Sequence, residues 1–347
     1  MILKIIFNIM FPEHIKNILR IKFRFIFESI DRYLMYKNYM KACRQILYPI
    51  FYDSDAYKYR DNLFLKKING EYLKKIYSNQ LENDDELKRC FDYIDKFGID
   101  TFCYEDMHQN IFDENDIYYD ENKKMYYAFY KNKKLYLKRS IDTEAKAKNL
   151  FNSLATEQLP QSPHCYLTST FRPAKGGIVF DIGCAEGNFV LEVIDSISKA
   201  YMFECDEEWI EALEETFKPY KEKICIVPKL VSDKSNDGTI TIDEFCSANN
   251  IQNIDLIKMD VEGYEKKVLC GSKNMLVNKA ISMISVCVYH NFSDEKEIGE
   301  MLKKDGYILD IPERYMAWNR KFDIMELNDQ IFTHGIIRAS LLKRKKM

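Results

Sequence analysis

The chain has 347 residues, of which 46% are hydrophobic and 30% charged, and its net charge is −3. This composition is typical of a folded water-soluble protein and excludes a disordered or membrane-embedded chain. The length predicts more than one structural unit. Its ten cysteines form no C-x-x-C pair, which argues against structural zinc and a disulfide framework and for a reducing cytoplasm. The many Tyr and Phe residues accompany a Lys- and Ile-rich composition, so we do not predict a nucleic-acid partner.

The N-terminal part is basic, because residues 1–50 contain nine Lys or Arg against three Asp or Glu. Its apolar run, residues 5–11, is too short to span a membrane. Residues 15–30 read as a basic amphipathic helix. Either this helix holds the protein peripherally on an anionic inner membrane face, or it packs on the domain with its lysines in water.

The pattern of residues 28–137 predicts a cap that leans on the catalytic domain. Residues 28–91 have a helical pattern, with connections expected at Gly70 and residues 82–86. Two short strands, 126–130 and 135–137, flank a lysine-rich turn and predict a β-hairpin. We therefore expect a helical and hairpin cap over residues 1–150, a catalytic domain over 151–340 and a basic tail over 341–347.

The segment before the first strand of the second domain reads Gln-Ser-Pro-His-Cys-Tyr over residues 161–166. Pro163 restricts the backbone beside His164. A loop at this position can fold over a ligand. His164 is thus either a structural histidine or a contact for substrate or cofactor.

The strongest ligand signal is the run IVFDIGCAEG at residues 178–187. It predicts a buried parallel strand that turns sharply into a helix. The spacing of Asp181, Gly183 and Gly187 differs from the G-x-G-x-x-G of dinucleotide sites, where backbone N–H groups hold a pyrophosphate. Glu186 would place a carboxylate near that pyrophosphate. The pattern therefore favours S-adenosylmethionine, which carries an ammonium and a sulfonium and no phosphate.

The second and third strands add further cofactor candidates. Residues 200–203 form a strand that ends in Glu204, where an acid can accept hydrogen bonds from both ribose hydroxyls. A third strand over 224–227 is followed by Ser232 and Asp233. These two either approach the exocyclic amine of adenine or are ordinary turn residues.

The fourth strand, residues 254–259, leads into Asp260 and Glu262. Ligands of open α/β sheets bind beyond the carboxyl ends of the strands, so both carboxylates should share the cleft of Gly183. They could orient a hydroxyl, act as a base or help to hold a divalent metal. For Glu262 the alternative is a cap on the helix that follows.

The fifth strand, residues 281–288, runs into Tyr289 and His290. A histidine at the tip of a buried strand is well placed for proton transfer. A helix over 294–304 and strands over 307–311 and 332–338 complete the pattern. The prediction is an α/β fold with a seven-stranded sheet that ends in a hairpin.

Four motifs in this order, FDIGCAEGNF, MFECD, LIKMDVEGYE and VYHN, resemble the FkbM family of S-adenosylmethionine-dependent methyltransferases. The resemblance covers about residues 157–339, and the SPHCY segment is similar to a bacterial branch found among surface-polysaccharide genes. It implies a class I, Rossmann-like methyltransferase fold with helices on both sheet faces, and O-methylation of a sugar. The ending ERYMAWNRK has no clear counterpart in the family. The resemblance implies cofactor roles for Asp181, Gly183, Gly187 and Glu204, with Glu186 near the ammonium, and an active-site role for His290, Asp260 and Glu262. From their positions in the chain, Asn188, Ser232 and Asp233 are further cofactor candidates, and His164 and Tyr289 are candidate substrate contacts.

The implied chemistry is an in-line attack of a hydroxyl oxygen on the sulfonium methyl group, which requires positioning above all. His290 is the first candidate for the base and Asp260 the second. No metal site is predicted, and a divalent-metal requirement stays open. The two rival functions are a nicotinamide dehydrogenase, which Glu186 disfavours, and a non-catalytic member that binds S-adenosylmethionine or glycans in a membrane-associated assembly.

Overall fold

The structure is a computed structural model, and it describes residues 73–74, 77–108, 111–113, 116–318 and 331–341. The expected amphipathic helix over 15–30, most of the helical pattern over 28–91 and nearly all of the basic tail therefore lie outside the described residues. No helix in the described part is long and apolar enough to cross a membrane.

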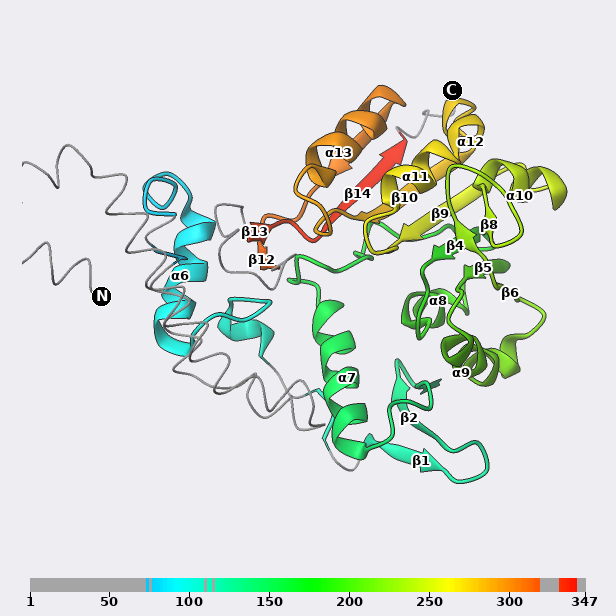
Figure 1. The fold of residues 1–347 in the computed structure, drawn as a ribbon, viewed down its shortest axis with the longest axis horizontal. Coiled ribbons are helices and arrows are strands. Elements are labelled where there is room, and N and C mark those ends of the chain that lie inside the picture. Colours follow the sequence, from blue (N-terminus) through cyan, green and yellow to red (C-terminus); the bar gives the residue numbers. More distant parts are fainter. Residues whose placement is uncertain (1–72, 75–76, 109–110, 114–115, 319–330, 342–347) are drawn as a thin grey trace, which may run out of the picture.

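A seven-stranded sheet forms the centre of the catalytic domain, as the sequence predicts (Figure 1). Five neighbouring strands are parallel, and β14 runs antiparallel to both of its neighbours. This arrangement is a doubly wound, Rossmann-like α/β sheet. The strands, in their order across the sheet, are β11 (Tyr307–Asp310), β14 (Ile336–Leu341), β10 (Ile281–Cys287), β9 (Ile254–Met259), β4 (Ile178–Ile182), β5 (Lys199–Phe203) and β6 (Ile224–Val227).

Helices cover both faces of this sheet (Figure 1). Side chains along β4 alternate between the two faces of the sheet. On one face, Val179 packs in the hydrophobic cluster that includes α8 and α9. On the other face, Phe180 and Ile182 pack in the cluster that includes α10, α11 and α13. The helices of the domain are α8 (Asn188–Val193), α9 (Glu207–Phe217), the short 3-10 turn η3 (Lys218–Tyr220), α10 (Ile242–Ala248), α11 (Glu265–Cys270), α12 (Lys273–Val277) and α13 (Asp294–Lys304).

Two small strand pairs lie outside the main sheet. They are β7 (Leu230–Val231) with β8 (Thr239–Ile240), and β12 (Met316–Ala317) with β13 (Phe332–Thr333). The single final strand expected over 332–338 is wrong, because Phe332–Thr333 pairs with β12 and the sheet resumes only at Ile336. The break lies at Gly335, where the chain passes so close to Pro163 that a Cβ would lie 2.6 Å from its carbonyl oxygen.

The cap consists of a helical part and a hairpin. Its elements are α6 (Asp85–Phe97), the 3-10 turn η1 (Glu105–Met107), β1 (Tyr118–Asp120), β2 (Met125–Tyr130), β3 (Lys133–Tyr136) and α7 (Glu144–Glu157). The predicted hairpin is confirmed as β2 and β3. The acidic residues 82–86, expected as a connection, instead include the start of α6, because the Asp84 carboxylate caps the helix by accepting from Leu87 N at 2.9 Å.

The cap contacts the catalytic domain at two places. The hairpin packs on α9, where Tyr136 N donates to Thr216 Oγ1 at 2.9 Å and Lys138 pairs with Asp206. The helical part meets the other end of the domain, where Tyr77 makes an edge contact with Phe332 of β13.

Candidate active site

The glycine turn joins β4 to α8 beneath the carboxyl end of the sheet. Gly183 has φ +70°, and a Cβ there would lie 2.0 Å from the carbonyl oxygen of Asp260. Gly187 has φ +79°, and its Cβ would lie within 3 Å of Leu213 and Phe217 on α9. Only glycine therefore fits at either position. Gly183 keeps the turn against the end of β9, and Gly187 keeps it against α9.

Asp181 is fully buried and forms an ion pair with a buried lysine that the sequence analysis did not single out. Lys258 Nζ lies 3.2 Å from Asp181 Oδ1 and donates to the carbonyl oxygen of Gly183 at 2.6 Å. The predicted contact of Asp181 with the cofactor stays a prediction, and its carboxylate is buried. Through this ion pair and the hydrogen bond of Lys258 to Gly183, Asp181 and Lys258 hold the glycine turn in place.

Glu204 holds the turn from the second strand. Its Oε2 accepts from Ala185 N at 2.9 Å, and its Oε1 accepts from Cys205 N and Asp206 N at 2.7 and 2.9 Å. Oε1 thus already accepts two hydrogen bonds, whereas Oε2 accepts one and has a second lone pair for a ligand hydroxyl. Glu204 thus lies where the ribose role requires it, at the tip of β5.

Two further acids lie in this region. Glu186 is 8% exposed, and burial, reinforced by Glu157 and Asp181, raises its pKa to about 8. Glu157, at the end of α7, has a pKa of about 7 because burial and Asp260 raise it. Asn188 begins α8 beside Glu186 and is buried. Lys258 acts to lower the pKa of both acids, but burial outweighs it, so both carboxyl groups bind a proton more readily than free ones.

Asp260 is the centre of the site. Its Oδ2 accepts from Tyr166 OH at 2.8 Å, and its Oδ1 accepts from Tyr289 OH at 3.4 Å. Burial acts to raise its pKa, but Lys258 and two nearby histidines, His164 and His290, together lower it. The carboxylate is therefore ionised at neutral pH, and the two tyrosine hydroxyls set its orientation.

His290 lies between two carboxylates. Its Nδ1 is 2.9 Å from Glu265 Oε1, and its Nε2 is 3.5 Å from Asp260 Oδ1. Burial acts to lower the pKa of His290, but Glu265 and Asp260, with Glu262, raise it overall above the ordinary 6.5. Carboxylates therefore face both nitrogens of the ring and favour its protonated form.

Glu265 is the functional residue that the sequence analysis missed. Its side chain is completely buried, and Oε1 also accepts from Val261 N at 3.0 Å and Gly263 N at 3.4 Å. The motif DVEGYE contains it, but its position at the start of the predicted helix made it look like a helix-terminal acid. Its distance from the strand end hid its contact with His290, which lies 25 positions later.

Glu262, predicted as catalytic, points largely to solvent. Its side chain is 87% exposed, although Oε2 lies 3.5 Å from His290 Nε2. Its backbone has φ +52°, a left-handed conformation that is rare outside glycine. The capping alternative is wrong as well, since the N-cap residue of α11 is Tyr264. Glu262 therefore bends the loop and is at most a weak partner of His290.

The two substrate candidates are part of the wall around Asp260. His164 is 4% exposed, its Nε2 lies 3.5 Å from Cys287 Sγ and 3.9 Å from Asp260 Oδ2, and burial lowers its pKa to about 4. Tyr289 is 7% exposed, and its ring packs against Trp318 at 4.8 Å. Both are buried beside Asp260 and His164 is neutral at pH 7, and their contact with a substrate stays a prediction.

Ser232 and Asp233 follow β7 and contact each other. Ser232 Oγ donates to Asp233 Oδ1 at 3.1 Å, and Asp233 lines a different cavity, with Thr241 and Asp243, beside α10 and α12. None of the turn residues from 183 to 187 borders that cavity. Their proposed contact with adenine therefore has no support in this geometry.

Among the described residues, two sets of side chains bring possible metal ligands within 4.8 Å of one another. They are His164, Asp260 and Cys287, and Asp260, Glu265 and His290. In the second set the histidine meets its two carboxylates through opposite ring nitrogens. A metal needs its ligand atoms to converge on one point, so this geometry favours a proton relay over a cation site.

Residues 199–309 match the family model of the methyltransferase FkbM domain. The match includes Glu204, Asp260, Glu265 and His290, and it confirms the resemblance found in the sequence motifs. No curated protein sequence gives a significant match.

Solved structures similar to this chain include methyltransferases. The methyltransferase FkbM from Methylobacillus flagellatus KT is 14% identical with a TM-score of 0.40, and the alignment covers 58% of this chain and 54% of that one. The chain thus spans about half the length of that protein. A precorrin-6y C5,15-methyltransferase from Geobacter metallireducens is 11% identical, covering 49% and 83%, with a TM-score of 0.32. M. capricolum TrmK with S-adenosyl-homocysteine is 15% identical, covering 48% and 63%, with a TM-score of 0.32.

Proposed function

Since this chain carries a methyltransferase domain of the FkbM family over residues 199–309, we propose that it moves a methyl group from S-adenosylmethionine to a hydroxyl oxygen of a saccharide. The observation that carries the proposal is His290, which two carboxylates hold beside the glycine turn. S-adenosylmethionine supplies an activated methyl group when bound. The protein must then position the acceptor oxygen and remove its proton.

The charges around the turn fit this cofactor and do not fit a dinucleotide. Glu157 and Glu186 are acids with raised pKa values, and Glu204 lies at the tip of β5. The buried cation Lys258 is already engaged by Asp181 and the turn carbonyl. A ligand with an ammonium and a sulfonium would relieve this excess of acid, whereas a pyrophosphate would add to it.

In this mechanism His290 accepts the proton of the acceptor hydroxyl through Nε2. Glu265 keeps Nδ1 protonated and orients the ring, in the way that a third group orients the base of a triad. Asp260 stabilises the imidazolium that forms. Because the pKa of His290 is raised above 6.5, the neutral ring is a stronger base than free imidazole.

Isothermal titration of the full chain with S-adenosylmethionine, S-adenosylhomocysteine and NAD tests the cofactor assignment. We expect the first two to bind and NAD not to bind. Glu204→Ala should weaken both, while Glu207→Ala, an exposed acid three residues further on, should not. Binding of NAD alone would overturn the proposal in favour of a dehydrogenase.

The alternative of a non-catalytic cofactor- or glycan-binding member needs its own test. Formation of S-adenosylhomocysteine should be measured with neutral oligosaccharides as acceptors, using the wild type and His290→Gln. Turnover that is lost in the variant supports methyl transfer. Cofactor and glycan binding without turnover would support the binding function instead.

A further inference from the structure

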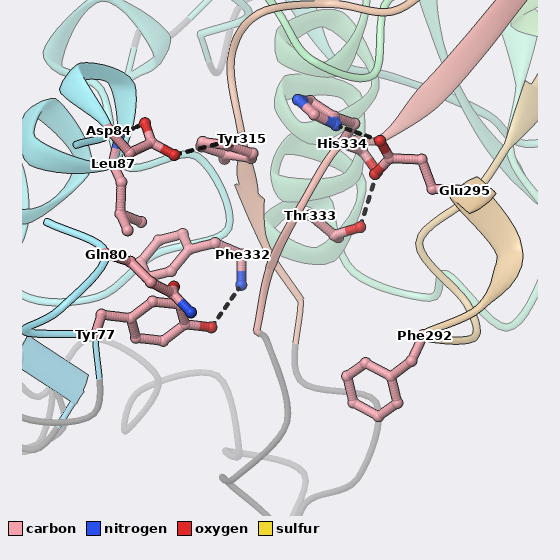
Figure 2. A pocket seen from close by; sticks show the side chains of 10 residues that line it. All are labelled: Tyr77, Gln80, Asp84, Leu87, Phe292, Glu295, Tyr315, Phe332, Thr333 and His334. Atoms are coloured by element: carbon pink, nitrogen blue, oxygen red, sulfur yellow. Dashed lines mark hydrogen bonds and ion pairs between the residues drawn. The ribbon is translucent and has the colours of Figure 1, made fainter.

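A cavity of about 330 Å³ lies between the cap and the catalytic domain (Figure 2). Three separate parts of the chain line it: the segment before and at the start of α6, the start of α13, and the strands β12 and β13 with their flanks. The lining residues are Tyr77, Gln80, Asp84, Leu87, Phe292, Glu295, Tyr315, Phe332, Thr333 and His334. Its volume is at the lower end of the range of small-molecule sites.

The lining combines aromatic surfaces with hydrogen-bonding groups. Tyr77, Phe292, Tyr315 and Phe332 supply rings, and Phe292 is 47% exposed. Gln80 is exposed, and its amide offers both a donor and an acceptor. Leu87 is the single aliphatic residue of the lining. This mixture suits a ligand with an apolar face and a polar rim, as a sugar ring has, better than a lipid chain.

The charged groups of the cavity are fixed in place and are mainly acidic. Asp84 Oδ2 accepts from Tyr315 OH at 3.0 Å, and Glu295 Oε1 lies 3.0 Å from His334 Nδ1 (Figure 2). Each carboxylate retains lone pairs for ligand hydroxyls. The described lining residues include no Lys or Arg. The cavity therefore disfavours phosphate, sulfate or carboxylate groups on its ligand.

The cavity is joined to the site at His290 by a rigid loop. Phe292 lies two positions after His290, and Asn291 is held by Asp294 Oδ2 through its backbone N at 3.0 Å and its side-chain Nδ2 at 2.9 Å. On the other side, Gly335, which follows His334, accepts from Val288 N at 3.0 Å. A ligand bound here would thus lie beside the carboxyl end of β10.

We propose that this cavity is the acceptor subsite and that it binds a neutral, polyhydroxylated ring of the saccharide. Phe292 stacks on the apolar face of the ring, and Gln80, Asp84 and Glu295 bind its hydroxyls. The assignment rests on the proposed methyl transfer for its purpose, but the binding itself can be tested without turnover.

The test is saturation-transfer NMR of the full chain with S-adenosylhomocysteine present. The probes are methyl α-D-glucopyranoside and methyl α-L-rhamnopyranoside, with glucuronic acid as the anionic control and cyclohexanol as the apolar one. At least one neutral glycoside should bind, and the affinity should fall about tenfold in Phe292→Ala, the loss expected for an aromatic contact. Gln80→Ala should weaken binding as well. Phe129→Ala is the matched control, because Phe129 is 49% exposed on the distant hairpin.

Three results would overturn the assignment: no binding of either glycoside, equal binding by wild type and both cavity variants, or binding of glucuronic acid or cyclohexanol as tight as that of the glycosides. Titration of the same variants with S-adenosylmethionine separates the two proposals. Cofactor binding without glycoside binding overturns the cavity alone. Glycoside binding without cofactor binding leaves the cavity assigned and overturns the methyl transfer.

Discussion

Replacing Glu265 by Gln tests whether this buried carboxylate sets the basicity of His290. The substitution keeps the size of the side chain and an oxygen that can accept from Val261 N, but it removes a charge 2.9 Å from Nδ1. An opposite charge at this distance changes a pKa by about 1 to 3 units. The pKa of His290 should therefore fall by about that amount in Glu265→Gln. A weaker base also gives less assistance, so the rate at high pH should fall by on the order of tenfold.

The assay is NMR titration of the histidine rings in the full chain, which has five histidines, with His290→Gln used to assign the signal. In kinetic measurements the rising limb of the pH profile should move to lower pH, because His290 acts in its neutral form. The matched control is Glu262→Gln on the same loop. Its carboxylate is 3.5 Å from Nε2 but 87% exposed, so solvent screening should limit the shift to less than about half a unit. An unchanged titration in Glu265→Gln, or equal shifts in both variants, would refute the reasoning.

Three other predictions concern the turn and the buried groups. Gly183→Ala should strongly lower the thermal stability and abolish cofactor binding, since its Cβ would lie 2.0 Å from a backbone oxygen. The control Gly176→Ala has a similar φ of +77° and nothing within 4 Å, so it should lower the free energy of unfolding by only about 1–2 kcal/mol. Similar melting temperatures for the two variants would contradict this. Binding of S-adenosylmethionine near pH 7 should release protons, because Glu186 has a pKa of about 8 and loses its proton beside a cation. Calorimetry in buffers of different ionisation enthalpy measures the number of protons released, and proton uptake would contradict the prediction. The pKa of His164 is lowered to about 4, so this residue binds a proton more weakly in the folded than in the unfolded protein. Between pH 6.5 and 4 the stability of the wild type should therefore fall by on the order of 3 kcal/mol more than that of His164→Gln. Urea unfolding at several pH values measures this, and the same pH dependence of stability in both proteins would exclude it.

The sequence predicts the sheet well because its signals are local. Strands β6 and β9 and helix α13 have the expected bounds, since short apolar runs and terminal acids depend on neighbouring residues alone. The predicted ends of β9 and β10 also place Asp260 and His290 at one edge of the sheet. The last strand is interrupted because Gly335 must pass Pro163, a contact between residues 172 positions apart that no local pattern reveals.

The partners of the site residues are less predictable for the same reason. Tyr166 reaches Asp260 across 94 positions, and Lys258 reaches the turn across 75. Asp181 looks like a ligand-binding acid in sequence, and no local pattern reveals its ion pair with Lys258. The cavity at Phe292 is harder still, because it exists only where the cap meets the strands β12 and β13. Local sequence patterns therefore predict the candidate active-site residues more easily than the residues that hold them in position.

The position of β14 has a consequence for how the chain is made. It is the last of the seven strands in sequence, yet it lies between β10 and β11 and pairs with both. Until residues 336–341 leave the ribosome, β11 has no neighbour in the sheet and β10 exposes an unpaired edge. Such edges recruit other chains. Until β14 is made, the parallel strands of the nascent protein therefore have an unpaired edge at β10. Pairing of β14 completes the sheet and covers this edge, which then no longer recruits other chains.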